Sequence, residues 1–213
     1  MKKILAIMFA IALVTLTGLT IATERTPEQI VDQTSFEVLT IINENNDKIR
    51  NDPEFVNQVI DEKILPYVDV KAMGKLILGK YWKTATEVQR DAFIKEFQDM
   101  LVRTYSKSIA DYGDAKIKVL PVRGQQSNKL HRVKTELDLG SGEPLQVEWM
   151  FRRINGEWKA FDLIVGGLSM VKNFRTSFTQ EISETSLDAL INRLANTNAE
   201  SETKTYAESG TAT

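Results

Sequence analysis

The spacing of apolar residues changes once along this chain, and this change constrains the fold class. In the first half, apolar residues recur every three or four positions; one stripe in the segment 87–112 consists of Phe93, Phe97, Leu101 and Tyr105. From residue 130 onward they alternate with polar residues, as in 145–151. The first spacing is typical of amphipathic helices and the second of half-buried strands. Because an antiparallel sheet with one apolar face needs a cover, the sequence predicts an α+β fold in which helices pack on that sheet.

Local signals indicate where these elements begin and turn. Helix starts are expected where a capping residue precedes a helical pattern, at Thr26, Asp52, Thr86 and Ser169. The pair Asn155–Gly156 is a strong signal for a tight hairpin. Together with the alternating segments, it predicts a curved antiparallel sheet of about four strands.

The two ends of the chain differ in composition from its body. Residues 1–22 contain two lysines followed by an unbroken run of apolar and small residues, which is typical of a secretory signal peptide. An uncleaved membrane anchor is the alternative, because the run is about long enough to cross a bilayer. Residues 196–213 are polar, so we expect a disordered tail. Residues 23–195 remain as one domain, and the absence of cysteine suits a fold exported without disulfides.

Composition favours binding over chemistry. The formal net charge is −2, and no long basic stripe indicates nucleic-acid binding. A single histidine, His131, cannot form a histidine cluster for a metal, and its place in an alternating strand predicts a solvated side chain. Asp162 and Glu148 are the candidate acids for an enzyme, but Glu148 alternates onto the polar face, and Asp162 has no matched acid, nucleophile or metal cluster. We therefore expect no catalytic residues, no metal and no cofactor.

Two stretches resemble signatures of the MlaC family, also called the toluene-tolerance auxiliary proteins. The first is "LPYVDVKAMGKLILGKYW" with the following "TATEVQRDAF" and Thr104-Tyr105. The second runs from Trp158 to Phe178 and includes Asp162, Ser169 and "NFR" at 173–175. The resemblance covers roughly residues 27–195. It departs from the family pattern at Gly166, where many relatives have an acidic residue.

The resemblance implies a periplasmic phospholipid carrier of Gram-negative bacteria, monomeric and with phospholipid as its cargo. Its partners would be an outer-membrane lipoprotein–porin complex and an inner-membrane ABC transporter with a lipid-binding ring. The implied fold leaves an apolar pocket in which strands 145–151 and 158–165 face helices 87–112 and 168–182. The candidate lipid-binding residues are Leu78, Phe93, Phe97, Leu101, Tyr105, Val147, Trp149, Phe151, Ile164, Leu168, Val171 and Phe174.

Three alternatives stay open at this stage. Each candidate residue could be pocket wall or ordinary core, since residues that line a hole and residues that fill it share one periodicity. The protein could be a periplasmic adaptor with a filled core, or a small enzyme that acts on lipids. Surface cations could contact a partner or a lipid phosphate, or be plainly solvated: Lys80, Lys83, Arg90, Arg103, Arg152 and Arg153.

Overall fold

The computed structural model describes residues 24–109, 115–121, 127–140 and 142–209, so the predicted signal segment lies outside it. The first helices are α2 (Pro27–Glu44), α3 (Asn46–Asn51) and α4 (Pro53–Val59), followed by the short turns η1 (Ile60–Ile64) and η2 (Leu65–Tyr67). Next come α5 (Val70–Leu78), α6 (Lys80–Thr84) and α7 (Glu87–Ile109). The strands are β1 (Lys116–Leu120), β2 (Leu130–Asp138), β3 (Leu145–Ile154), β4 (Glu157–Val165) and β5 (Leu168–Ser169), and the chain continues into α8 (Met170–Glu184) and α9 (Leu187–Ser209).

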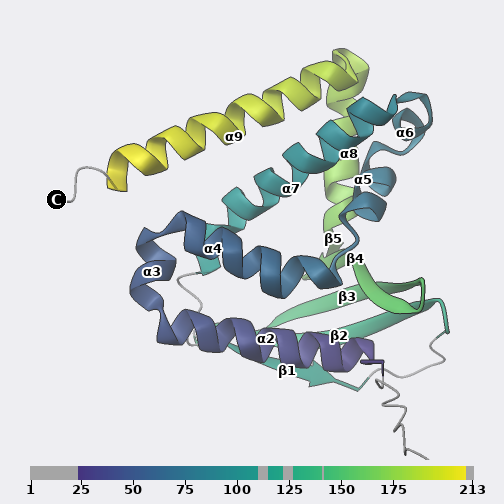
Figure 1. Ribbon diagram of the computed structural model, residues 1–213. Coiled ribbons are helices and arrows are strands. Elements are labelled where there is room, and N and C mark those ends of the chain that lie inside the picture. Colours follow the sequence, from purple (N-terminus) through teal and green to yellow (C-terminus); the bar gives the residue numbers. More distant parts are fainter. Residues whose placement is uncertain (1–23, 110–114, 122–126, 141, 210–213) are drawn as a thin grey trace, which may run out of the picture.

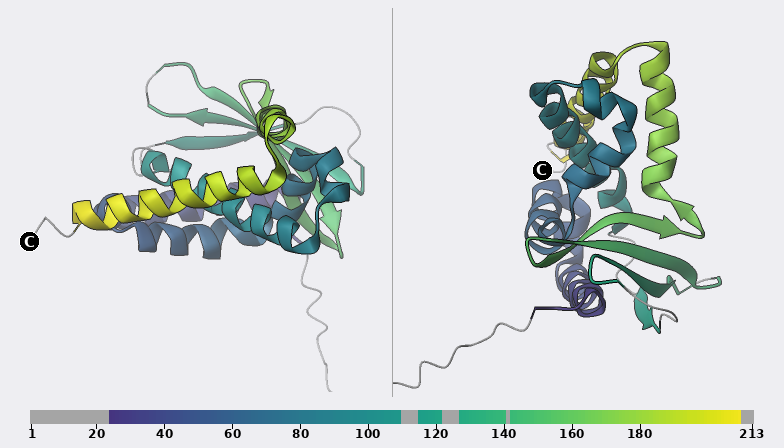
Figure 2. Two further views of the ribbon diagram at one scale, coloured as in Figure 1. Left: turned by 90° about the horizontal axis from the view of Figure 1, so that it is seen from above. Right: turned by 90° about the vertical axis from the view of Figure 1, so that its right-hand side faces the viewer.

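These elements form an α+β fold, as the change of spacing predicts. The five strands form one antiparallel sheet in the order β1-β2-β3-β4-β5. Helix α2 lies along the sheet, and α9 lies far from it, while α5 and α8 contact β4 (Figure 1). Figure 2 shows α8 rising from the β4–β5 end of the sheet into this helical part. The fifth strand is the two-residue β5, which the expectation of about four strands did not include.

The predicted caps are present. Thr26 and Gln29 form a capping box at α2, and the Asp52 carboxylate accepts the Phe55 amide at α4. Thr86 and Gln89 exchange the same reciprocal bonds before α7. At α8, the Ser169 hydroxyl accepts the Lys172 amide. These bonds satisfy amides that a helix end leaves without a partner, which is why short polar residues predicted the helix starts.

Helix α2 covers part of the apolar face of the sheet. Ile30 and Val31 of α2 pack in one cluster with Val133 of β2 and Phe151 of β3, and all four are at most 5% exposed. The sequence led us to expect α7 and α8 opposite the apolar strands. For this part of the sheet that expectation is wrong, because α2 runs back along β1 and β2 and buries its own apolar stripe there.

The helical part has a separate core of stacked aromatic rings. Phe93 and Phe97 of α7 lie face to face at a centroid distance of 5.8 Å. Phe178 of α8 contacts both edge-on, at 6.0 and 6.3 Å, and Phe174 contacts Phe97 at 5.3 Å. Phe93 and Phe97 are fully buried. Edge-to-face and offset stacking of this kind adds to the energy of burial, so this cluster holds α7 and α8 together.

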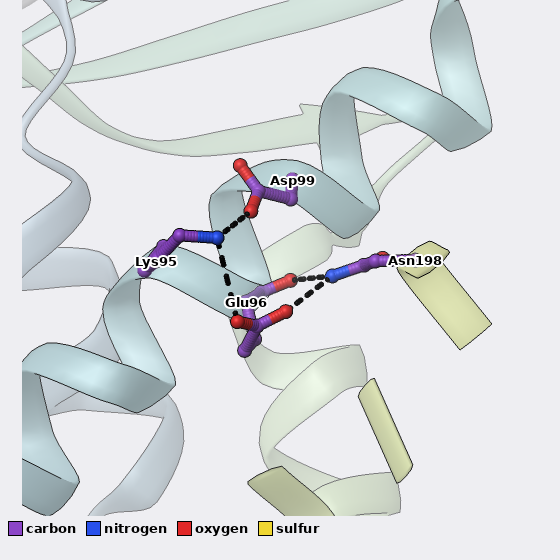
Figure 3. Close-up of polar contacts among 4 residues, drawn as sticks. All are labelled: Lys95, Glu96, Asp99 and Asn198. Atoms are coloured by element: carbon purple, nitrogen blue, oxygen red, sulfur yellow. Dashed lines mark hydrogen bonds and ion pairs between the residues drawn. The ribbon is translucent and has the colours of Figure 1, made fainter. Parts of the chain in front are cut away.

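Helix α9 extends beyond the end that the sequence predicts. We expected disorder from residue 196, but α9 continues to Ser209, and Asn198 is buried at 6% exposure. The Asn198 amide donates to the backbone carbonyl and to the carboxylate of Glu96 on α7, at 3.1 and 2.8 Å (Figure 3). Polar composition suggested a tail because the pattern does not reveal a side-chain amide that pairs with a neighbouring helix.

Replacing Asn198 by Asp should destabilise the protein at neutral pH. The new carboxylate would face both the carboxylate and the carbonyl of Glu96, with no donor between them, and we expect a loss of about 2 kcal/mol in unfolding free energy. Urea denaturation followed by circular dichroism measures it. Asn196→Asp is the matched control, since Asn196 is exposed on the same helix. Equal stability of the two variants would contradict the packing of α9 on α7.

Candidate functional site

The two signature stretches meet at the junction of α5, α6 and α8. Leu78 and Trp82 of the first signature belong to the same apolar cluster as Phe174 and Phe178 of the second. Between them lies Gly79, whose φ of +55° joins α5 to α6 in a conformation that favours glycine. The residues that carry the family resemblance therefore build one region of the structure.

The candidate lipid-binding residues divide into two groups. Six lie in the helical core around the phenylalanine rings: Leu78, Phe93, Phe97, Leu101, Val171 and Phe174. Trp149 and Phe151 lie in the cluster between the sheet and α2, and Val147 is buried on the same face of β3. The side chain of Tyr105 lies outside what the structure describes. The structure thus brings most candidates together within each group, while their contact with lipid stays a prediction.

Two candidates on β4 and β5 lie differently from the others. Ile164 is paired with Glu148 in the sheet, so it lies on the face opposite to Val147 and Trp149. Leu168 is 74% exposed. Besides Trp158 and Ala160, the β4 residues that share the apolar face include Leu163, opposite Trp149, and Val165, opposite Val147. The candidate list missed Leu163 and Val165.

A β-bulge explains why the alternation in β4 was misleading. The register shifts between Met150 and Phe151, so that Phe151 pairs with Ala160 but Met150 pairs with Asp162. Phe161 is the extra residue. Before it the even-numbered residues of β4 lie on the apolar face, and after it the odd-numbered residues do. The amino-acid sequence of β4 contains no signal for this register shift.

A buried polar pair lies on the apolar face of the sheet. The Trp149 indole N–H donates to the Thr135 hydroxyl at 3.1 Å, and that hydroxyl donates to the Val147 carbonyl, also at 3.1 Å. Thr135 is 1% exposed. These two bonds give both side-chain donors, the indole N–H and the hydroxyl, an acceptor. The surface beside Val147 is therefore effectively apolar.

Exposed leucines border this face at the end of the sheet where β4 turns into β5. Leu145 lies two residues before Val147 on the same face and is 36% exposed. Leu168 is paired with Val165, which is paired in turn with Val147. The buried apolar face thus continues to an exposed apolar rim. A rim of this kind is suited to contact with an apolar ligand or partner.

Asp162 positions α8 on the sheet. Its carboxylate accepts the Leu163 amide at 2.8 Å, the Ser169 hydroxyl at 2.6 Å and the Val171 amide at 3.0 Å. Glu148, the other acid considered for an enzyme, forms ion pairs with Arg132 and Lys134 at 3.3 and 3.1 Å. Both carboxylates are engaged in structural contacts, and this arrangement provides no free acid and base for catalysis.

His131 is not the solvated residue that the sequence predicts. Its side chain is 15% exposed, lies 5.6 Å from the Trp158 ring, and its Nε2 is 2.5 Å from a carboxylate oxygen of Glu28 on α2. Burial is the largest single influence and raises the pKa of Glu28, but the hydrogen bond and electrostatic attraction of His131, together with hydrogen bonds from its own backbone and from Thr26, leave that pKa below its usual value. The pair fixes α2 to β2, where α2 covers the sheet.

Four of the six surface cations donate to oxygen atoms within the protein. Arg90 donates to the Trp82 carbonyl, and Arg103 to the Thr197 carbonyl. Arg152 pairs with Asp69, and Arg153 with Glu24. Lys83 is exposed. Lys80 lies at an open groove of about 730 Å³ between α6 and α8, lined by Lys80, Tyr81, Lys172, Arg175, Thr176, Thr179, Gln180 and Ser183.

Two further findings concern metals and membranes. Within the described ranges, the structure contains no group of three or more His, Cys, Asp or Glu residues placed to hold a metal ion. In the same ranges, none of the helices combines the length and the apolar character that crossing a membrane requires.

Comparisons with known proteins agree on one family. Residues 32–196 match the sequence family described as "MlaC protein". The intermembrane phospholipid transport system binding protein MlaC of Haemophilus influenzae is 24% identical, with 91% of this chain and 92% of that protein aligned. The toluene tolerance protein ttg2D of Pseudomonas putida is 26% identical, with 80% and 79% aligned. A Ralstonia solanacearum phospholipid-binding protein, solved with a phospholipid, has the same fold: its TM-score is 0.77 at 23% identity, with 84% and 99% covered.

Proposed function

This chain belongs to the MlaC family, and from that membership we propose that it is a phospholipid carrier of the periplasm. It takes up phospholipid at one membrane and delivers it at the other, and so maintains the lipid asymmetry of the outer membrane. The family match over residues 32–196 carries this proposal. Relatives named for phospholipid transport and toluene tolerance support it, and so does the shared fold of a protein solved with phospholipid.

We propose that the acyl chains lie between the free part of the apolar sheet face and the helical core. The sheet side consists of Val147, Leu163 and Val165, with Trp149 at the border of the part that α2 covers. On the helical side, Leu101 and Phe174 are only partly buried, whereas Phe93 and Phe97 are fully buried among other side chains. Leu101 and Phe174 therefore contact the lipid, and Phe93 and Phe97 support them. Leu145 and Leu168 form the mouth.

The energy of burial explains why such a carrier needs docking partners. Each methylene removed from water contributes about 0.8 kcal/mol, so two acyl chains amount to tens of kcal/mol. Spontaneous release into water is therefore negligible, and delivery requires a partner that offers a continuous apolar path. We propose an outer-membrane lipoprotein–porin complex and an inner-membrane ABC transporter with a lipid-binding ring. The carrier itself is a monomer that reaches the periplasm through a cleaved signal peptide at residues 1–22, and it binds its cargo without catalysis or a resident cofactor.

Native mass spectrometry of the protein purified from a Gram-negative periplasm tests this function. We expect a species heavier than the mature polypeptide by one intact phospholipid, because burial of two acyl chains keeps the cargo bound during purification. A bare polypeptide mass after mild purification and after incubation with phospholipid vesicles would contradict a carrier and favour an adaptor. Cleaved lipid in the same samples would indicate an enzyme.

A further inference from the structure

The groove between α6 and α8 has an unusual balance of charge. Its lining contains three cations, Lys80, Lys172 and Arg175, and no acidic residue. The chain as a whole has slightly more acidic than basic residues, 29 against 27. Some exposed arginines elsewhere in the described structure face carboxylates, as Arg193 does with Glu181 at 2.7 Å. A cationic surface without such partners attracts anions from solution.

The guanidinium of Arg175 lies against the backbone between α5 and α6. A Cβ atom on Gly79 would lie 3.1 Å from Nη2 and 3.2 Å from Nε of Arg175, so the guanidinium lies against the bare backbone of Gly79. Gly79 also has a left-handed φ of +55°, which a larger residue adopts only with strain. Within the described part of the chain, no carboxylate forms an ion pair with this guanidinium. Its N–H groups are thus available to an external acceptor.

The three cations occupy neighbouring places in the lining of the groove. Lys80 follows Gly79 directly, and Lys172 lies one helical turn before Arg175. The Lys80 ammonium is held 4.9 Å over the ring of Tyr81. A compact cluster fits one small anion, whereas an extended acidic segment of a protein needs cations spread along its path.

The other side chains that α8 contributes to the groove are polar and neutral, and their hydroxyl groups are already used as donors. Thr176 and Thr179 donate to the carbonyls of Lys172 and Arg175, at 3.0 and 2.7 Å, and Ser183 donates to the carbonyl of Gln180 at 2.6 Å. Anion recognition therefore falls to the cations. A planar guanidinium fork beside two ammonium groups is the set of donors that suits a phosphate.

We propose that this groove binds a phosphate group, either that of a phospholipid headgroup or free phosphate. Both signature stretches contribute to it, through Gly79, Lys80 and Tyr81 on one side and Arg175 on the other. It lies on the face of α8 next to the one that Phe174 and Phe178 present to the helical core. The site thus differs from the proposed acyl-chain site. The inference rests on the proposed function only for the headgroup as a source of phosphate, which a carrier meets at every membrane.

The test uses the double variant Lys172→Gln/Arg175→Gln, with Lys75→Gln as the control because Lys75 is exposed on α5 outside the groove. One arm measures cosedimentation with phosphatidylglycerol vesicles and with phosphatidylcholine vesicles. The other follows the amide signals of Gly79 and Arg175 by NMR during titration with inorganic phosphate, against chloride at equal ionic strength. We expect the double variant to bind roughly tenfold more weakly, since charged hydrogen bonds are lost, and the control to bind unchanged.

The two measurements distinguish a lipid headgroup from free phosphate as the source of the bound phosphate group. They also distinguish failure of this proposal from failure of the carrier function. Weakened binding of phosphatidylglycerol vesicles together with a lost phosphate titration supports the headgroup, and a lost phosphate titration alone supports free phosphate. The proposal is overturned if neither ligand distinguishes the double variant from the control, including the case in which only an acidic peptide does. Bound cargo is measured separately by native mass spectrometry. Wild-type protein without cargo would refute the carrier function. The phosphate titration would still test whether the groove binds phosphate.

Discussion

Phe97→Ala should cost about 3–5 kcal/mol of unfolding free energy in protein freed of lipid. Phe97 is fully buried and contacts three other rings, those of Phe93, Phe174 and Phe178. Truncation removes the transfer energy of the ring and leaves a cavity that two helices cannot close without moving. Chemical denaturation, followed by circular dichroism or by tryptophan fluorescence, measures the loss.

Phe36→Ala is the matched control for this prediction. Phe36 lies on α2 and is 73% exposed, so we expect a change within about 0.5 kcal/mol. The comparison also bears on the proposed site, because a ring that lines an open lipid cavity in the empty protein would have fewer packing partners to lose. A loss at Phe97 no larger than that at Phe36 would show that the empty protein lacks this aromatic core.

The sequence predicted those features that arise from local chemistry. Periodicity distinguished helices from strands, and caps such as Thr26 and Asp52 marked helix starts because their side chains bond amides three residues away. The stripe of Phe93 and Phe97 predicted a buried helix face correctly. What this face packs against is decided by tertiary contacts that leave no local mark, and for that reason α2, not α7 or α8, covers Val133 and Phe151.

The candidate site was predicted less completely, for related reasons. The bulge at Phe161 changes which β4 residues share a face with Val147, so Leu163 and Val165 were missed. The groove cations Lys172 and Arg175 were missed because they become neighbours of Lys80 only when α6 and α8 pack together. The family resemblance did draw attention to Arg175, but its meaning depends on the glycine it covers.

Val147→Trp and Leu101→Trp should each abolish co-purification of phospholipid while the protein stays folded. Val147 is 6% exposed on the sheet side of the proposed acyl-chain site, and Leu101 is partly buried on the helical side. An indole on either side fills the volume in which we place the chains. Each chain methylene that is kept out forfeits about 0.8 kcal/mol, so exclusion of most of the chain length removes the burial energy that keeps the lipid bound. Native mass spectrometry measures the bound lipid.

The control for size is Val88→Trp, because Val88 is 78% exposed at the start of α7 and lies outside the proposed site. Circular dichroism and a thermal melt separate lost lipid from lost fold, and the two test variants approach the site from different elements, so one folded variant is enough to decide. Overpacking a buried position costs about 1–3 kcal/mol, which a domain of ordinary stability tolerates. If folded Val147→Trp and Leu101→Trp retain lipid as Val88→Trp does, the acyl chains do not lie between the sheet and α7.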